Sequence, residues 1–200
     1  MANPAHLKVL LAGAATWNRW RVDNPMLRPN LREADLQAVD LAGANLHNTY
    51  LFGADLSRAY LFEADFQAAN LRGANLHRCC LIGANLHNAY LAEANLRHAY
   101  LAETDLSDAY LGGANLRAAD LQGAILSSTF WEKADLQGAD FSGVHDVAIA
   151  NLLMAHNLEL ATFDDALRAQ LNLPALPAPA PPALPAQTDD RDSTPIPDSR

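Results

Sequence analysis

A large apolar residue recurs at every fifth position of this chain, from Leu31 to Phe141. The 23 positions of this series hold 20 Leu, two Phe and Trp131, and none of them is polar. Two residues earlier, from Ala34 to Ala139, 17 of 22 positions are Ala. A helix would need apolar residues at i, i+3, i+4 and i+7, and a lone strand would alternate every two residues. The period of five therefore excludes both as the repeating element and indicates a repeat architecture.

The repeating unit is Ala-(Asp/Asn/Tyr)-Leu-x-x, and its spacing predicts which side chains are buried. Ala and Leu lie two residues apart, so in an extended segment they point to one side and the residue between them points away. The other two residues have to turn the chain. Glycine is common at the last position, where a positive φ costs it least: Gly43, Gly53, Gly73, Gly83, Gly113, Gly123, Gly138 and Gly143. Short extended pieces that each bury only one side must stack into a coil.

Units such as Ala44-Asn45-Leu46, Ala54-Asp55-Leu56 and Ala114-Asn115-Leu116 give the sequence a resemblance to the pentapeptide-repeat family. The resemblance covers roughly residues 30–143. It implies an all-β solenoid: a right-handed quadrilateral β-helix with four pentapeptides per coil, so that the 23 units make nearly six coils. Ala and Leu would fill the interior, and the other three positions of each unit would face solvent.

Short α-helical caps are expected at both ends, because an open solenoid exposes a leucine layer and unpaired strand edges. At the N-terminus, Asn3 can cap a helix with Pro4 at its first position, and Asn24-Pro25 ends the helical segment, with Gly13 as a break. The stretch Trp17-Asn18-Arg19-Trp20-Arg21 resembles the lead-in before the repeats of some cyanobacterial and other bacterial members of the family. Its two Trp are expected to lie on the first coil.

Beyond the repeats, Asp146 can cap a helix over 147–156, and Thr162 with Asp165 forms the start of a second helix that contains Phe163. Eight of the eleven prolines lie in 174–200, which predicts a disordered, Pro-rich tail. The predicted organisation is an N-terminal helical cap over 1–27, a pentapeptide-repeat β-helix over 28–144, a C-terminal helical cap over 145–173 and the tail over 174–200.

The composition argues against several classes of function. The net charge of −9 argues against direct nucleic-acid binding, and no apolar run is long enough to cross a membrane. The only two cysteines, Cys79 and Cys80, do not form a secreted disulfide scaffold, so a reduced, cytoplasmic compartment is predicted. His47 and His87 share a column but lie two coils, ~10 Å, apart, too far to bind one metal ion. No catalytic pair, phosphate loop or metal spacing stands out, so we expect neither an enzyme nor a cofactor.

Outward aromatic side chains form the candidate interaction surface. All five tyrosines occupy the position before Leu at spacings that are multiples of ten, which places them on two opposite faces of a coil of twenty residues. Their rings could stabilise the ladder of parallel strands or form a stripe that binds a partner. Near the last repeats, Ile125, Phe130 and Trp131 could either dock the C-terminal helices or form a dimer contact. The candidate surface comprises Tyr50, Phe52, Tyr60, Phe62, Tyr90, Tyr100, Tyr110, Phe130 and Trp131.

The sequence therefore predicts a non-catalytic protein-interaction scaffold that has an unknown protein partner and forms a homodimer through its C-terminal helices. An alternative comes from the resemblance, because some members of the family bind or protect DNA gyrase by imitating duplex DNA. The acidic repeats are compatible with that function. One basic column weakens it, since these residues are expected on a single face: Arg58, His77, Arg78, Arg97, His98 and Arg117.

Overall fold

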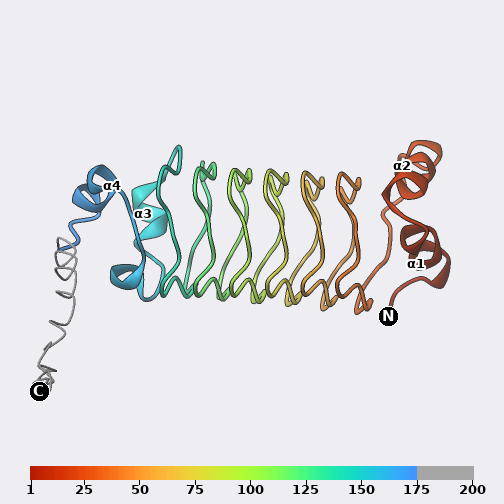
Figure 1. Ribbon diagram of the computed structural model, residues 1–200, viewed down its shortest axis with the longest axis horizontal. Coiled ribbons are helices and arrows are strands. Elements are labelled where there is room, and N and C mark those ends of the chain that lie inside the picture. Colours follow the sequence, from red (N-terminus) through yellow and green to blue (C-terminus); the bar gives the residue numbers. More distant parts are fainter. Residues whose placement is uncertain (175–200) are drawn as a thin grey trace, which may run out of the picture.

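A computed structural model describes residues 1–174 of the chain as a row of stacked coils with helices at both ends (Figure 1). The N-terminal end carries α1 (Pro4–Leu11) and α2 (Ala14–Asp23). The C-terminal end carries α3 (Ile149–Leu152), the 3-10 helix η1 (Leu158–Leu160) and α4 (Asp165–Gln170). The Pro-rich tail predicted over 174–200 lies outside the described residues from position 175 onward.

Each coil contains twenty residues, because the outward residue of every unit pairs in parallel with the residue twenty positions later, from Asn30↔Tyr50 to Ile125↔His145. This spacing makes four pentapeptides per coil, as predicted. The Asp55 N–H bonds to the Ala34 carbonyl of the coil before at 2.9 Å, and the Asp55 carbonyl accepts the Leu36 N–H at 2.7 Å. Between residues 1 and 174 these pairings are isolated bridges rather than longer strands, because a turn follows every few residues.

The turn between units has the same form in all 23 repeats. Its last residue always has a positive φ, and in fifteen of the repeats that residue is not glycine. The carbonyl of the inward Leu accepts the N–H three residues on, as in Ala34 N to Leu31 O at 3.2 Å. A positive φ at the third position identifies a type II turn. The preference of glycine for this position is confirmed, but the coil also holds Glu, Asn, Arg and Lys in the left-handed region.

The interior is built from the predicted columns. The Leu positions from Leu31 to Phe141 are at most 2% exposed, and the Ala positions beside them are similarly buried. Threonine replaces Ala at Thr49, Thr104 and Thr129 without leaving its hydroxyl unpaired. The hydroxyl of Thr104 donates to the Leu101 carbonyl at 2.6 Å, and that of Thr129 donates to the Leu106 carbonyl at 2.9 Å.

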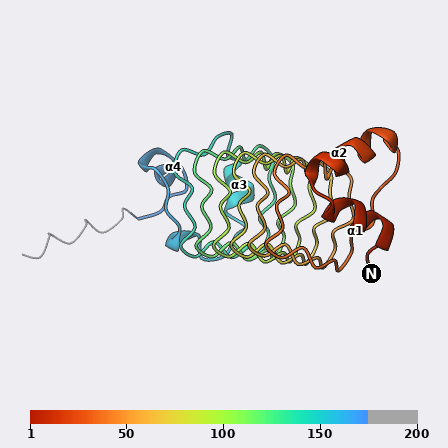
Figure 2. The same ribbon diagram turned by 45° about the vertical axis from the view of Figure 1, so that its right-hand side comes forward.

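Side chains of α2 complete the first coil where no earlier coil exists, and α1 and α2 cover that end of the rod (Figure 2). The indole N–H of Trp17 donates to the Asn45 carbonyl at 2.7 Å, and the Asn45 N–H donates to the side chain of Asn18 at 2.7 Å. Arg21 is 2% exposed and donates to the His47 carbonyl at 3.0 Å. The expected cap, the Asn3 N-cap and the break at Gly13 are confirmed.

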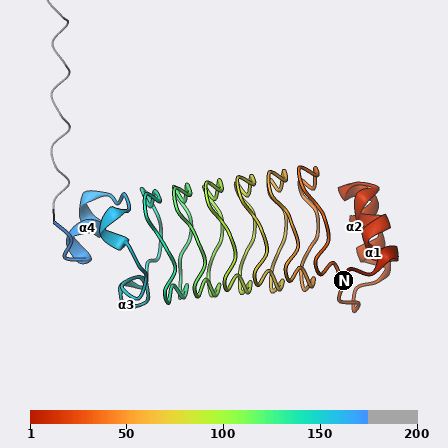
Figure 3. The ribbon, with the colours of Figure 1, turned by 90° about the horizontal axis from the view of Figure 1, so that it is seen from below.

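The C-terminal end differs from the prediction of two simple helices. The helix expected over 147–156 is reduced to the four residues of α3, and the chain then returns to the ladder through Asp135↔His156 and Asp140↔Thr162. These bridges span 21 and 22 residues instead of twenty. The ladder therefore continues past residue 144, and Figure 3 shows the C-terminal residues closing that end of the rod.

The difference arises because the chain forms one more unit, Ala161-Thr162-Phe163, whose positions are out of register with the period of five. Ala161 and Phe163 are buried at 2% and 4% exposure, and the ring of Phe163 stacks on Phe141 with centroids 5.2 Å apart. Thr162 consequently lies in the ladder and does not cap a helix. The N-cap of α4 is Asp164, whose side chain accepts the Leu167 N–H at 3.0 Å.

Candidate functional site

The outward position between Ala and Leu mostly holds Asp or Asn, because these side chains hydrogen-bond to the backbone of the turn that follows them. Their side-chain oxygen accepts the backbone N–H two residues later, as in Ser57 N to Asp55 at 2.9 Å. Neighbouring coils are linked as well, since Asn75 donates to Asp55 at 3.0 Å and Asn95 donates to Asn75 at 2.9 Å. Asp and Asn both supply the acceptor that the turn needs, which explains why they alternate freely along the chain.

A first aromatic stripe, defined as Tyr50, Phe52, Tyr90, Tyr110 and Phe130, follows one column of the rod. The rings of Tyr90 and Tyr110 stack with centroids 5.2 Å apart and planes 11° apart, and Phe130 follows Tyr110 at 6.3 Å. Tyr90 is 41% exposed and Phe130 is 48% exposed. Three successive coils therefore present one continuous aromatic surface.

Tyr50 stands apart from that stack because Asn70 occupies the intervening coil. The guanidinium of Arg32 lies 4.5 Å from the centre of the Tyr50 ring, and Arg28 donates to its hydroxyl at 3.5 Å. This hydrogen bond and the nearby Arg28 charge lower the pKa of the Tyr50 hydroxyl. Tyr50 thus lies at the N-terminal end of the first aromatic stripe, where arginine side chains contact its ring and its hydroxyl.

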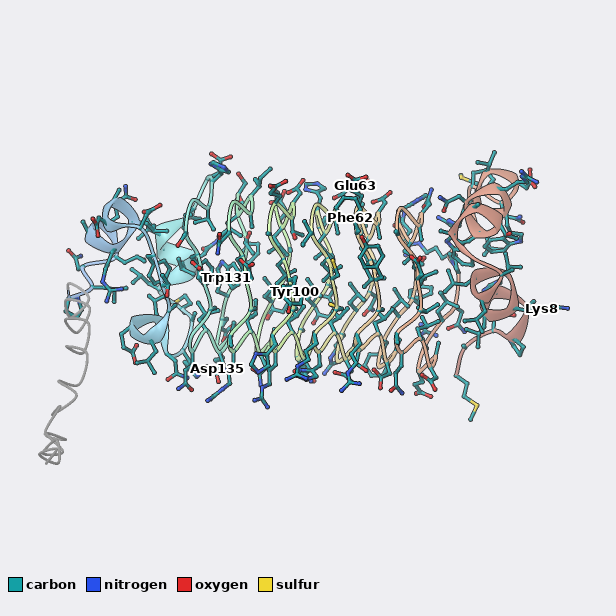
Figure 4. The ribbon with its side chains drawn as sticks, in the orientation of Figure 1. Lys8, Phe62, Glu63, Tyr100, Trp131 and Asp135 are labelled. Atoms are coloured by element: carbon teal, nitrogen blue, oxygen red, sulfur yellow. The ribbon has the colours of Figure 1, made fainter. Side chains whose placement is uncertain are left out.

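A second aromatic stripe, defined as Tyr60, Phe62 and Tyr100, lies on another face. Tyr60 stacks on Phe62 with centroids 6.3 Å apart, and Cys80 separates Tyr60 from Tyr100 in the ladder. Figure 4 shows Phe62 and Glu63 at one long edge of the rod and Tyr100 on the face below it. The second stripe is less continuous than the first, because two coils separate its two tyrosines.

Trp131 is wrongly included among the surface candidates. It is 2% exposed and points into the coil, where its ring meets Phe141 edge-on with centroids 5.7 Å apart. The physical reason is its register, since Trp131 occupies a Leu position and takes the inward direction of that column. It is therefore a core residue and not part of a partner-binding surface.

The outward rings are accommodated by the residue two positions later, a signal that the sequence analysis missed. A Cβ at Gly112 would lie only 2.6 Å from the Tyr110 hydroxyl, which shows that the ring lies along its own turn. Ala92, two residues after Tyr90, is 4% exposed. The residue two positions later is small for Tyr90, Tyr100 and Tyr110, and this pattern could have predicted the direction of those three rings.

The first aromatic stripe ends at a hollow of about 170 Å³ beside α3. Its lining includes Tyr110, Phe130 and Met154, together with Asn151, which donates to the Thr129 carbonyl at 3.1 Å. C-terminal residues therefore do dock beside Phe130. They leave about half of its ring exposed, along with Met154 at 58%.

A basic edge runs along one corner of the rod, as the sequence predicted. It comprises Arg58, His77, Arg78, Arg97, His98 and Arg117, which occupy the same turn in four successive coils. The backbone of Arg78 bonds to that of Arg97, and the backbone of His98 bonds to that of Arg117, both at 3.0 Å. The rings of His77 and His98 are 5.7 Å apart.

The titratable groups of residues 1–174 do not gather into a recognisable reactive centre. No group of three or more His, Cys, Asp or Glu residues within that part of the chain could hold a metal ion. Cys79 is fully buried, and burial raises the pKa of its thiol, whereas Cys80 is partly exposed. None of the helices described is long and apolar enough to span a membrane.

Comparison with solved structures finds other pentapeptide repeat proteins. HetL, involved in heterocyst differentiation regulation in the cyanobacterium Nostoc sp. strain PCC 7120, is 35% identical, with a TM-score of 0.42 over 56% of this chain and 55% of HetL. This chain therefore spans about half the length of HetL. A protein from the thylakoid lumen of Arabidopsis thaliana is 31% identical, with a TM-score of 0.47 over 59% of this chain and 77% of that one.

A trypsin-treated variant of QnrB1, a plasmid-mediated fluoroquinolone resistance protein, is 20% identical, with a TM-score of 0.39 over 74% of this chain and 90% of that chain. No curated protein matches the chain. The sequence also matches the family model described as Pentapeptide repeats in eight copies, which together span residues 30–145, more than half of the chain. With its twenty-residue coils and inward Ala and Leu columns, the chain belongs to the pentapeptide repeat family.

Proposed function

We propose that this protein is a non-catalytic, right-handed β-helical scaffold that binds a protein partner through its first aromatic stripe. The observation that carries the proposal is the row of rings across three coils, in which the half-buried Tyr110 lies between the exposed Tyr90 and Phe130. Tyrosine supplies a large apolar contact area and a hydroxyl for hydrogen bonding, and it is enriched at protein interfaces. A rigid coil presents these rings with little conformational freedom left to lose on binding.

The surrounding polar groups support binding rather than chemistry. The Asp and Asn side chains of the faces are engaged with their own turns, as for Asp105, which accepts the Ser107 N–H at 2.9 Å. The partner is therefore expected to recognise shape and aromatic surface. We keep the cytoplasm as the proposed compartment, because both cysteines are free.

The experiment compares partner capture by the natural protein and by a Tyr90→Ser/Tyr110→Ser variant. Capture from a native lysate, followed by mass spectrometry, should identify at least one protein that the double variant no longer retains. A Ser107→Ala/Gln122→Ala variant is the matched control and should retain it. Melting temperatures of all three proteins separate the two explanations for the stack. If the double variant has a lower melting temperature yet captures the same proteins, the two rings stabilise the ladder and do not bind a partner.

DNA gyrase is the second candidate partner, favoured by the charge distribution of the coils. Between residues 33 and 130 the chain has eleven Asp and Glu but only five Arg and Lys, and four of those five lie on the basic edge. The charged residues outside the basic edge are therefore almost all acidic, which is compatible with imitation of DNA. A gyrase supercoiling assay tests this candidate: a change in supercoiling at micromolar protein is expected if it is right, and unaltered supercoiling would reject it.

A further inference from the structure

The basic edge is a largely uncompensated positive charge on a protein with a net charge of −9. Its twelve turn positions, from Gln37 to Gly138, include four arginines and two histidines but no Asp or Glu. Arg58, Arg78 and Arg97 are exposed, and no carboxylate of residues 1–174 lies within 4.0 Å of their guanidinium groups. Of the four arginines of the edge, Arg117 alone makes an ion pair within residues 1–174, with Asp135 at 3.4 Å. Figure 4 shows nitrogen-bearing side chains projecting along the edge beside Asp135.

The fifth arginine of this part of the rod shows a different arrangement. Arg72 lies at another corner and pairs with Glu93 of the next coil at 2.9 Å. At that corner acidic and basic residues alternate, whereas along the basic edge each coil places one more cation beside the last. Parallel cations one coil apart, at ~4.8 Å, repel one another. This repulsion destabilises the row when nothing is bound to it. An anion that lies along the row relieves the repulsion.

The residues that flank the edge in its two middle coils are uncharged. Asn75 and Asn95 flank it on one side, and Cys80 and Tyr100 on the other. Tyr100 is 52% exposed beside the row. The centre of the edge is thus a positive strip with neutral margins, while Asp55 and Asp120 lie beside its outer coils.

We propose that the basic edge binds an extended acidic segment of a protein partner, laid along the axis of the rod. The four arginines span three coil steps, or ~14 Å. Three carboxylates at alternate positions of an extended chain span ~13 Å, because the rise is ~3.3 Å per residue. Three of the four guanidinium groups can then each bind one carboxylate in a bidentate pair. This site lies on a different face from the first aromatic stripe, so it does not depend on the function proposed above.

A protein segment fits this edge better than a nucleic acid does. Duplex DNA is far wider than a single row of arginines and would meet the acidic faces on both sides of it. The net charge of −9 would further oppose its approach. A single extended peptide contacts only the strip and its neutral margins.

Fluorescence anisotropy with the full-length protein tests the proposal. The probe is a fluorescein-labelled nine-residue peptide with Glu at alternate positions and Ser between them. We expect saturable binding in 20 mM salt that weakens markedly in 200 mM salt. An Arg78→Gln/Arg97→Gln variant should bind about tenfold more weakly. The same peptide with Gln in place of Glu should not bind.

Arg72→Gln is the matched control, because it removes one arginine of the same rod outside the edge. It should leave the affinity unchanged, and melting temperatures verify that every variant is folded. Equal weakening by Arg72→Gln, or no binding in 20 mM salt, would overturn the proposal. A labelled nine-nucleotide oligothymidylate that binds at least as tightly would assign the edge to nucleic acid instead. Tighter peptide binding by a full-length Asp189→Asn/Asp190→Asn/Asp192→Asn variant would show that the chain's own terminus is the occupant.

Discussion

At the scale of single residues, each position of the five-residue repeat meets one physical requirement of the coil. The Leu position fills the interior, the Ala position allows neighbouring sides of the coil to approach, and the Asp or Asn position binds its turn. The last position must adopt a positive φ, which costs a non-glycine residue about 1–2 kcal/mol. Its N–H bonds to the next coil, as in Glu33 N to Phe52 O at 2.9 Å, and this bond helps to offset the cost.

Replacement of Leu96 by Ala should lower the free energy of unfolding by about 2–5 kcal/mol. Leu96 is 1% exposed in the middle of the rod, so the substitution leaves a cavity that the stacked coils cannot close. Urea unfolding followed by circular dichroism measures the change. Ser107→Ala, on an outward turn, is the control and should be nearly neutral. An unchanged midpoint for Leu96→Ala would mean that the register is wrong.

At the scale of elements, the two ends of the rod are closed by different means. At the N-terminus, Trp17, Asn18 and Arg21 supply the hydrogen bonds that a preceding coil would have made to Asn45 and His47. At the C-terminus, the chain itself returns to the ladder. There Asn157 donates to Asp135 at 2.8 Å, and although burial raises the pKa of that carboxyl, this bond with those from Gln137 and Arg117 lowers it overall.

Asn18→Ala should destabilise the protein by about 1–3 kcal/mol, since it leaves the Asn45 N–H without its acceptor. The loss should appear in urea unfolding and in faster hydrogen exchange at the Asn45 amide. The neighbouring substitution Arg19→Ala is the control, because Arg19 is exposed and makes no ion pair within residues 1–174. Equal effects of the two substitutions would contradict the proposed completion of the first coil.

Acid should loosen the N-terminal cap. Burial lowers the pKa of His47 below 6.5, and the nearby Arg21 charge lowers it further, although Asp65 opposes them; burial also lowers the pKa of His6. The unfolded chain therefore binds protons more readily than the folded one, so this stability is present above pH ~6.5 and is lost as the pH falls through the lowered folded values.

Melting temperatures between pH 7.5 and pH 5 measure the effect, which should be smaller in His47→Gln. His98→Gln, on the exposed basic edge, serves as the control and should keep the natural pH dependence. A His47→Gln protein with the full acid sensitivity would show that the cap is not its source.

At the scale of the whole molecule, the C-terminal end of the rod carries exposed apolar side chains. Leu153, Met154 and Leu160 are 51%, 58% and 51% exposed near the C-terminal end, and Met154 lines the same hollow as Phe130, which is 48% exposed. Large apolar side chains gathered in this way mark a contact surface more often than isolated ones do. A two-fold contact between C-terminal ends would bury them on both copies.

We therefore expect light scattering at micromolar concentration to give about twice the 21.6 kDa mass of one chain. Leu153→Glu should restore the monomer, because it places a charge in the contact. Val22→Glu is the control, since Val22 is also an exposed apolar residue but lies at the other end of the rod, and this variant should remain dimeric. A natural protein that scatters as a monomer would exclude the dimer.

The amino-acid sequence by itself determined the coil. Its period sets which side chains point inward, and Asn3, Pro4 and Gly13 mark the helices before it. These features follow from the sequence because each depends on residues within a few positions of one another. The twenty-residue coil was expected from the family resemblance, and the ladder pairs confirm it.

Only the tertiary structure decided how the rod ends and how its outward rings lie. The re-entry of Ala161-Thr162-Phe163, twenty-two residues after Ala139-Asp140-Phe141, depends on covering an open leucine layer, so no local period predicts it. The stack of Tyr90 on Tyr110 and the burial of Arg21 likewise require a neighbouring coil or helix to be in place. Such contacts join residues brought together by stacking, and their geometry exists only once the coil has formed.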